Sequence, residues 1–169
     1  MKKTLCNRAV IQRCQWHKRE NVLRYLSKDL KAEYRRKLQA AYEYPSYDQA
    51  KQALLRIRRE LTTINLSAVE SLEEGLEETL TLHRLGVFPQ VGISFKTANC
   101  MESIMSQVEQ KTNKVDNWRN SDQKQRWVAT SLLDLEKRLH KVKRHKYLTL
   151  LRTALQKELK IVITQKEAA

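Results

Sequence analysis

The chain is organised around the stretch SFKTANCMESIMSQVEQKT, which occupies residues 94–112. Asn99 is expected to accept a backbone N–H bond at the N-cap of a helix, and Glu102, three residues later, completes a capping-box pattern. The apolar residues that follow recur at the i, i+3, i+4 and i+7 spacing of one buried helix face. That face consists of Met101, Ile104, Met105 and Val108. The stretch therefore predicts a capped amphipathic helix.

Two carboxylates stand seven residues apart beside the apolar face of this predicted helix. Because seven residues make about two turns, Glu102 and Glu109 would project together toward a metal ion or a phosphate. A carboxylate in the first turn also stabilises the N-terminus of a helix by its charge. The spacing alone favours this structural role for Glu102 over a catalytic one.

A strongly basic composition indicates the kind of partner. The 169 residues include 33 lysines and arginines against 19 aspartates and glutamates, a net charge of +14. Twelve of the basic residues lie within the first 37 positions, against three acidic ones. Lysine and arginine release counterions when they neutralise phosphates, so this charge is typical of nucleic-acid-binding proteins, although solvated basic faces share it.

The remaining composition favours a helical globule in a reducing compartment. Only three glycines and two prolines occur, with 41% hydrophobic residues, in a chain long enough to build a core. The sequence contains no run of 18 apolar residues, which excludes a membrane span, and no long apolar segment of a signal peptide. Cys6, Cys14 and Cys100 are widely spaced and odd in number, which predicts a cytoplasmic location.

Hydrophobic periodicity predicts one strand and then helices over most of the chain. The apolar run at residues 9–11 fits a buried strand that ends near Cys14. Helices are predicted at 20–26 and 29–42, and then from a capping box at Ser46 and Gln49 to about Ile64. Ser67 and Glu70 repeat the capping pattern and open a predicted helix that reaches Leu85, where Gly86 and Pro89 stop it.

The C-terminal third reads as a polar turn followed by two helices. The turn is predicted at residues 113–120, and the last helix at about 145–162. Between them, apolar residues alternate at steps of four and three, a pattern that suits packing against another helix. This seam consists of Val128, Leu132, Leu135, Leu139 and Val142.

Three ordered motifs carry more specific information: QRCQWHKRENV at residues 12–22, LEETLTLHRLGVFP at 76–89 and KTANCMES at 96–103. The first is similar to the Gln-Arg-Cys-x-x-His-Lys-x-x-Asn-Val signature of the Mutator-type transposases of bacterial insertion sequences. The third resembles that family's Arg-Thr-Thr-Asn-x-Ile-Glu segment, whose glutamate ends an Asp-Asp-Glu metal-binding triad. The second resembles the helix that precedes this segment.

The resemblance implies a mainly α chain that combines a helical insertion with a remnant of an RNase H-like α/β catalytic domain. Residues 1–18 would hold the one short strand near the N-terminus and the Cys-x-x-His motif. Residues 19–90 would form the all-helical insertion. Residues 91–115 would form the RNase H-like helix with the catalytic glutamate, and residues 116–169 a C-terminal helical region.

The resemblance also implies metal-dependent DNA transposition. In this family two Mg²⁺ or Mn²⁺ ions held by carboxylates support phosphodiester cleavage and strand transfer on transposon ends and target DNA. Glu102 matches the third carboxylate, which makes it the implied catalytic residue and metal ligand. The two aspartates precede the Cys-x-x-His segment in the family, so Asp29 and Asp48 do not match them. We therefore expect the chain to correspond to a C-terminal part, inactive alone, with a homodimer as the family expectation.

The basic residues nearest the two motifs are the predicted phosphate contacts. They are Arg13, Lys18, Arg19 and Lys96. The motif residues Cys14, His17 and Asn99 match the family pattern directly. Cys14 and His17 could also form half of a zinc site, but structural zinc takes four ligands and no second pair stands at a suitable spacing. The family-typical alternative is that they order the edge of the active site.

A second reading of the whole sequence is non-enzymatic. A basic, mainly helical protein that binds nucleic acid or a helical partner would show the same charge and the same periodicity. The three ordered motifs favour the transposase over this alternative.

Overall fold

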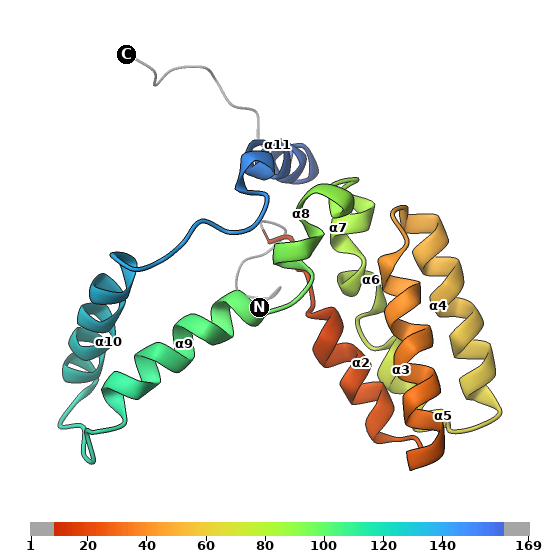
Figure 1. The fold of residues 1–169 in the computed structure, drawn as a ribbon, viewed down its shortest axis with the longest axis horizontal. Helices are drawn as coiled ribbons and strands as arrows, with labels where there is room; N and C mark the ends of the chain where they lie inside the picture. Colours follow the sequence, from red (N-terminus) through yellow and green to blue (C-terminus); the bar gives the residue numbers. More distant parts are fainter. Residues whose placement is uncertain (1–8, 161–169) are drawn as a thin grey trace. The chain divides into compact units, whose positions relative to one another are not determined.

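Four helices pack side by side around the main hydrophobic core. The computed structural model describes residues 9–160. The four helices are α2 (Gln15–Arg24), α3 (Lys28–Glu43), α4 (Tyr47–Thr62) and α5 (Leu66–Glu73). Each packs against the next along the chain, and α5 also packs against α2, which closes the bundle (Figure 1). The most deeply buried side chains include Leu23, Leu38, Leu54, Leu61 and Leu72. Burying each contributes about 1.5–3 kcal/mol.

Local capping explains where two of these helices begin. The side chain of Ser46 accepts a hydrogen bond from the backbone N–H of Gln49 at 3.3 Å, so the predicted start of α4 is confirmed. The predicted cap at Ser67 is wrong, because Asn65 Oδ1 accepts from Ala68 N at 3.1 Å and α5 begins at Leu66. The first helix starts at Gln15 rather than at residue 20, since its first turn packs into the protein.

The single helix predicted from residue 67 to 85 is wrong, because the chain turns at Gly75. This residue has a φ of 68°, a conformation that glycine adopts without the strain of other residues. Two short helices follow, α6 (Leu76–Thr79) and α7 (Thr81–Arg84). The motif at residues 76–89 therefore folds as a succession of turns that faces the start of α2.

A second hydrophobic cluster lies at the end of the motif at residues 76–89. It is built by α7, α8 (Phe88–Phe95), the short η2 (His145–Tyr147) and α11 (Leu148–Glu158). Leu82, Val87, Phe88 and Val91 are its buried members, and Leu151 and Ala154 pack against them. Gly86 ends α7 with a φ of 70°, as predicted. Pro89, by contrast, lies in the first turn of α8, a position in which proline costs no hydrogen bond.

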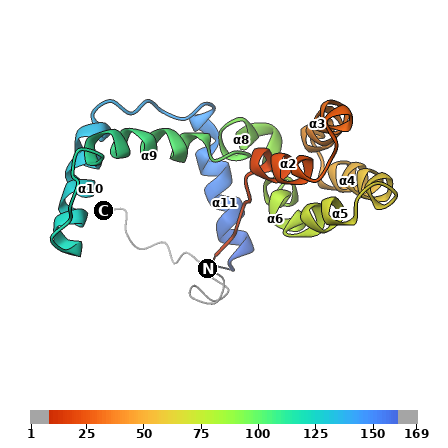
Figure 2. The same ribbon diagram turned by 90° about the horizontal axis from the view of Figure 1, so that it is seen from below.

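The helices α9 (Asn99–Thr112) and α10 (Ser121–Glu136) form a hairpin of their own. The chain divides into two compact units, of which residues 98–142 are the second. The described part of the first unit comprises residues 9–97 and 143–160. Figure 2 shows the hairpin from a second direction. Val108 and Leu135 are its most buried apolar side chains, and Asn120 caps α10 by accepting from Gln123 N at 2.9 Å.

Several predictions for the hairpin are wrong. Asn99 is the first helical residue rather than the N-cap, which is Ala98 and makes no side-chain cap bond. Of the predicted apolar face only Val108 is buried, while Met101 is 61% and Met105 56% exposed. In this unit α10 packs against the C-terminal half of α9, so the first half keeps its apolar face open. The seam is also shorter than predicted, because α10 ends at Glu136 before Leu139 and Val142.

The mainly α class is confirmed, but the strand predicted at residues 9–11 is absent from the described chain. A strand needs a neighbouring strand for its backbone hydrogen bonds. Here the segment bonds to helical turns instead: Arg13 N donates to Glu78 O at 2.8 Å, and Thr81 Oγ1 donates to Ile11 O at 2.7 Å. Within residues 9–160, no helix has the length and apolarity that a membrane crossing requires.

A buried histidine in α7 predicts that acid destabilises the folded chain. His83 is 3% exposed, stacks on Phe88 with ring centroids 3.7 Å apart, and its Nε2 lies 3.2 Å from Tyr42 O. Burial lowers the pKa of His83 below its ordinary value of 6.5. Below about pH 6.5 this histidine binds a proton in the unfolded chain but remains mostly neutral in the folded chain. The folded state therefore loses stability as the pH falls.

We therefore expect the free energy of unfolding to decrease between pH 7 and pH 5, by at most about 1.4 kcal/mol per pH unit. Urea titrations followed by circular dichroism at each pH measure it. The His83→Gln variant, which cannot titrate there, should show a flatter profile whatever its absolute stability. Parallel profiles for the two proteins would exclude His83 as the source.

Candidate nucleic-acid interface

The Cys-x-x-His motif lies at the start of α2. Cys14 is the N-cap residue, and His17 stands in the first turn on the exposed side. Trp16 is 46% exposed, and its ring meets that of His17 edge to face, with centroids 4.8 Å apart. An exposed indole beside an imidazole is a surface on which a base can stack.

Two glutamines hold this motif in place. Gln12 Nε2 and Gln15 Nε2 each donate to Thr79 O at 2.9 Å, and Gln12 Oε1 accepts from Leu82 N at 3.0 Å. The backbone N–H of Gln15 also donates to Lys96 O at 2.9 Å, which joins the start of α2 to the end of α8. The first and third sequence motifs therefore meet in space.

A groove of about 290 Å³ forms where they meet. It is lined by Gln15, Trp16, Arg19, Gln39, Tyr42, Glu43, Lys96 and Thr97. Arg19 Nη1 donates to Gln39 Oε1 at 3.1 Å, and Lys96 Nζ donates to Glu43 Oε1 at 2.5 Å. Two of the four predicted phosphate contacts, Arg19 and Lys96, thus line one groove together with the exposed indole.

Acidic neighbours hold the cations of this groove in place. Arg19 Nε lies 3.1 Å from Glu20 Oε1, and Arg35 Nη2 lies 2.9 Å from the other oxygen of the same carboxylate. The hydrogen bond from Arg35 lowers the pKa of Glu20, so this carboxylate stays ionised and binds both guanidinium groups. Each of these carboxylates is an intramolecular partner of a cation, and a phosphate would have to displace it in order to bind.

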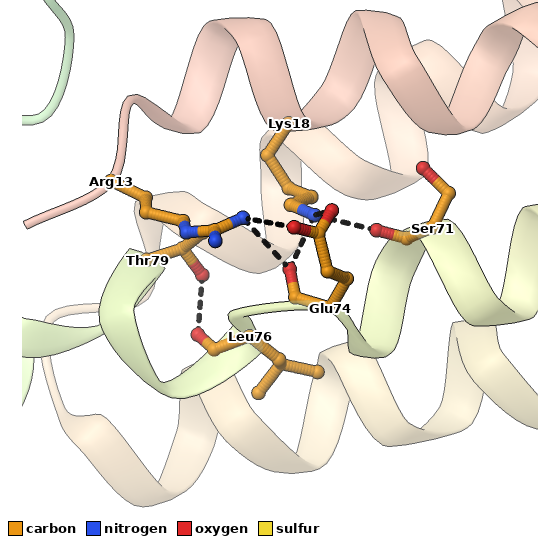
Figure 3. A network of polar contacts seen from close by, with 6 residues as sticks. All are labelled: Arg13, Lys18, Ser71, Glu74, Leu76 and Thr79. Atoms are coloured by element: carbon orange, nitrogen blue, oxygen red, sulfur yellow. Dashed lines mark hydrogen bonds and ion pairs between the residues drawn. The ribbon is translucent and has the colours of Figure 1, made fainter.

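The other two predicted contacts, Arg13 and Lys18, belong to a separate network that Figure 3 shows. Lys18 is 4% exposed, and its Nζ donates to Ser71 O at 2.6 Å and to Glu74 O. Arg13 Nη1 lies 2.9 Å from Glu74 Oε1. Burial lowers the pKa of Lys18, while the Glu74 carboxylate opposes this effect. In this structure the Lys18 ammonium caps the C-terminal carbonyls of α5.

Glu102 lies in the first turn of α9 with its side chain exposed, and Asn99 opens the same helix. Among residues 9–160 no three His, Cys, Asp or Glu side chains come together in a way that could hold a metal ion. Cys14 and His17 likewise have no third ligand of this kind near them in the described chain. The described residues therefore do not fit a metal centre by themselves.

Sequence reasoning missed three groove residues on α3, namely Gln39, Tyr42 and Glu43. Gln39 and Glu43 are four residues apart, so they share a helix face, and this spacing is visible in the sequence. The contact of this face with α2 and the end of α8 depends on packing between residues that are far apart in the sequence. A local sequence pattern does not predict such packing.

Basic side chains beside an exposed aromatic ring are typical of proteins that handle nucleic acids. The sequence model of the family described as Transposase, Mutator family matches residues 2–141. The chain belongs to the Mutator family of transposases. No curated protein and no solved structure matches the chain.

Proposed function

We propose that the chain binds DNA and takes part in metal-dependent DNA transposition. The family match over residues 2–141 carries this proposal. The net charge of +14 supports it, since transposition requires a protein that holds polyanionic substrates. We further propose that α9 corresponds to the helix of an RNase H-like catalytic domain that carries the third carboxylate of the family.

The groove of Arg19 and Lys96 is the proposed phosphate contact. Its two cations come from different segments, α2 and the end of α8, and both lie within hydrogen-bonding reach of acceptors at the groove wall. A phosphate that displaced the exposed Glu43 carboxylate would form a new ion pair with the Lys96 ammonium, and the DNA would release counterions. Trp16 supplies an apolar surface beside it.

Glu102 is the proposed metal-ligating carboxylate. Its exposed position in the first turn of α9 leaves it accessible to a Mg²⁺ or Mn²⁺ ion. Because the described residues form no metal centre by themselves, the other ligands would have to come from elsewhere than residues 9–160. The contribution assigned to this chain is one negatively charged oxygen ligand.

The groove predicts a defined loss of DNA affinity. Arg19→Gln and Lys96→Gln should each weaken binding of a duplex DNA fragment about three- to tenfold and lower its salt slope by about one, as expected for a lost phosphate contact. Fluorescence anisotropy of a labelled duplex at several salt concentrations measures both quantities.

Lys157→Gln is the matched control for charge, because Lys157 is an exposed lysine that does not line this groove. The DNA affinity of this variant should change less than twofold, as expected for a substitution at an exposed residue outside the binding site. If all three variants lost affinity equally, binding would depend on net charge alone and the groove assignment would be wrong.

A further inference from the structure

A second groove lies within the α9–α10 hairpin and is used by none of the motifs. Its volume is about 850 Å³, in the range of pockets that hold small organic ligands. Trp127 lines it and is 44% exposed. The ring of Trp118 meets that of Trp127 edge to face, with centroids 6.3 Å apart. This contact holds the indole in position while a large part of it stays open.

The charges around this indole are mainly positive. Lys111, Lys114 and Arg126 line the groove, against a single carboxylate, Asp134. Lys111 pairs with Asp134, whose other contact is Arg138 Nη2 at 3.3 Å. The hydrogen bond from Lys111 lowers the pKa of Asp134, so the carboxylate is ionised and already neutralised.

Two cations of the groove are therefore left to attract an anion. Within the described chain, neither Lys114 nor Arg126 makes an ion pair. Amide and hydroxyl side chains also line the groove, namely Gln110, Gln123, Thr130 and Ser131. Amides donate and accept hydrogen bonds at once, as base edges do. An aromatic face, unpaired cations and amides together match the parts of a nucleotide.

We propose that this groove binds unpaired nucleotides of DNA, with a base stacked on Trp127 and the neighbouring phosphates held by Lys114 and Arg126. A base in a duplex has both faces covered by its neighbours, whereas an unpaired base offers a free face to the indole. The groove would then hold a single-stranded segment during transposition. This inference rests on the proposed DNA function but on different residues from the duplex groove.

The test compares single-stranded with duplex DNA on the full chain. The probes are a fluorescein-labelled oligothymidine on the order of ten nucleotides long, within the site size of single-strand binders, and a duplex with the same number of phosphates. Trp127→Ala should weaken single-strand binding about tenfold, which corresponds to about 1.4 kcal/mol. Duplex binding should stay within about twofold, since it depends mainly on phosphate contacts. Trp127→Phe should recover most of the loss.

Matched variants separate stacking from charge and from folding. Tyr25→Ala removes another aromatic ring that is 50% exposed and lines neither groove, so it should leave single-strand affinity unchanged. Arg126→Gln should lower the salt slope of single-strand binding by about one. Lys124→Gln is its control, an exposed lysine on the same helix outside the groove. Circular dichroism verifies that each variant is folded.

Three results would overturn the inference: full affinity of Trp127→Ala for the single strand, an equal loss for both kinds of DNA, or no single-strand binding by the unaltered chain. Failure of the proposed function gives a different pattern. In that case duplex binding would be absent, or insensitive to Arg19→Gln and Lys96→Gln, while single-strand binding still depended on Trp127.

Discussion

We expect Glu102→Gln, introduced into a cleavage-competent transposase of this family, to abolish DNA cleavage and to leave DNA binding intact, as the proposed metal-ligating role requires. Glutamine keeps the size of the side chain and one oxygen but lacks the negative charge on which the binding of a divalent cation depends. We expect the cleavage rate to fall by at least about a thousandfold, which corresponds to about 4 kcal/mol of activation free energy. Gel assays of donor-DNA cleavage in Mg²⁺ and in Mn²⁺ measure the rate.

Glu136→Gln is the matched control for this experiment. Glu136 is also an exposed glutamate and is the last residue of α10, so its substitution changes the charge of the hairpin by the same amount. Cleavage should persist in this variant. Persistent cleavage by Glu102→Gln, at a rate near that of the unaltered enzyme, would remove Glu102 from the site.

Substitution of Lys18 by methionine will destabilise the bundle by about 2–4 kcal/mol, because it removes a buried donor from two backbone carbonyls. Only a long contact from Arg13 Nη1, at 3.4 Å, remains to one of them, Glu74 O. The carbonyls are those of Ser71 and Glu74 at the end of α5, and the ammonium that binds them is 4% exposed. Methionine has a similar length and fills the same space, so the loss reports the hydrogen bonds rather than a cavity. Urea unfolding followed by circular dichroism measures it.

Two controls distinguish capping of α5 from simple charge effects. Lys28→Met removes an exposed lysine at the start of α3 and should change stability by less than about 0.5 kcal/mol. Glu74→Gln removes the carboxylate of the network but keeps the backbone carbonyl, and since this side chain is 67% exposed the effect should be small. A larger loss for Glu74→Gln than for Lys18→Met would show that the ion pair, not the capping, stabilises the turn.

Lys18 also illustrates the limits of sequence reasoning about the site. Its place in a basic motif made it a predicted phosphate contact, together with Arg13, Arg19 and Lys96. The structure brings Arg19 and Lys96 into one groove and places Lys18 inside the bundle. Consecutive residues such as Lys18 and Arg19 point about 100° apart around a helix, and only the position of α5 determines which of these directions is interior.

The predictions that succeeded depend on nearby residues. The start of α4 was predictable because Ser46 and Gln49 are three residues apart and form a cap whatever surrounds them. The family was recognisable because its motifs are short strings of residue types, and the match over residues 2–141 bears this out. Helical class and basic charge follow in the same way from periodicity and composition.

Burial, in contrast, depends on which helix faces meet, and this was decided by contacts between distant residues. The apolar face of α9 satisfies every rule of helical spacing, yet Met101 and Met105 are exposed because α10 covers only the other end of the helix. Gly75 ends a pattern that reads as continuous helix, because the chain turns there with a φ of 68°, a conformation that glycine adopts without strain. Local sequence specifies which conformations a segment favours, whereas the neighbours that the fold supplies determine which of its surfaces are buried.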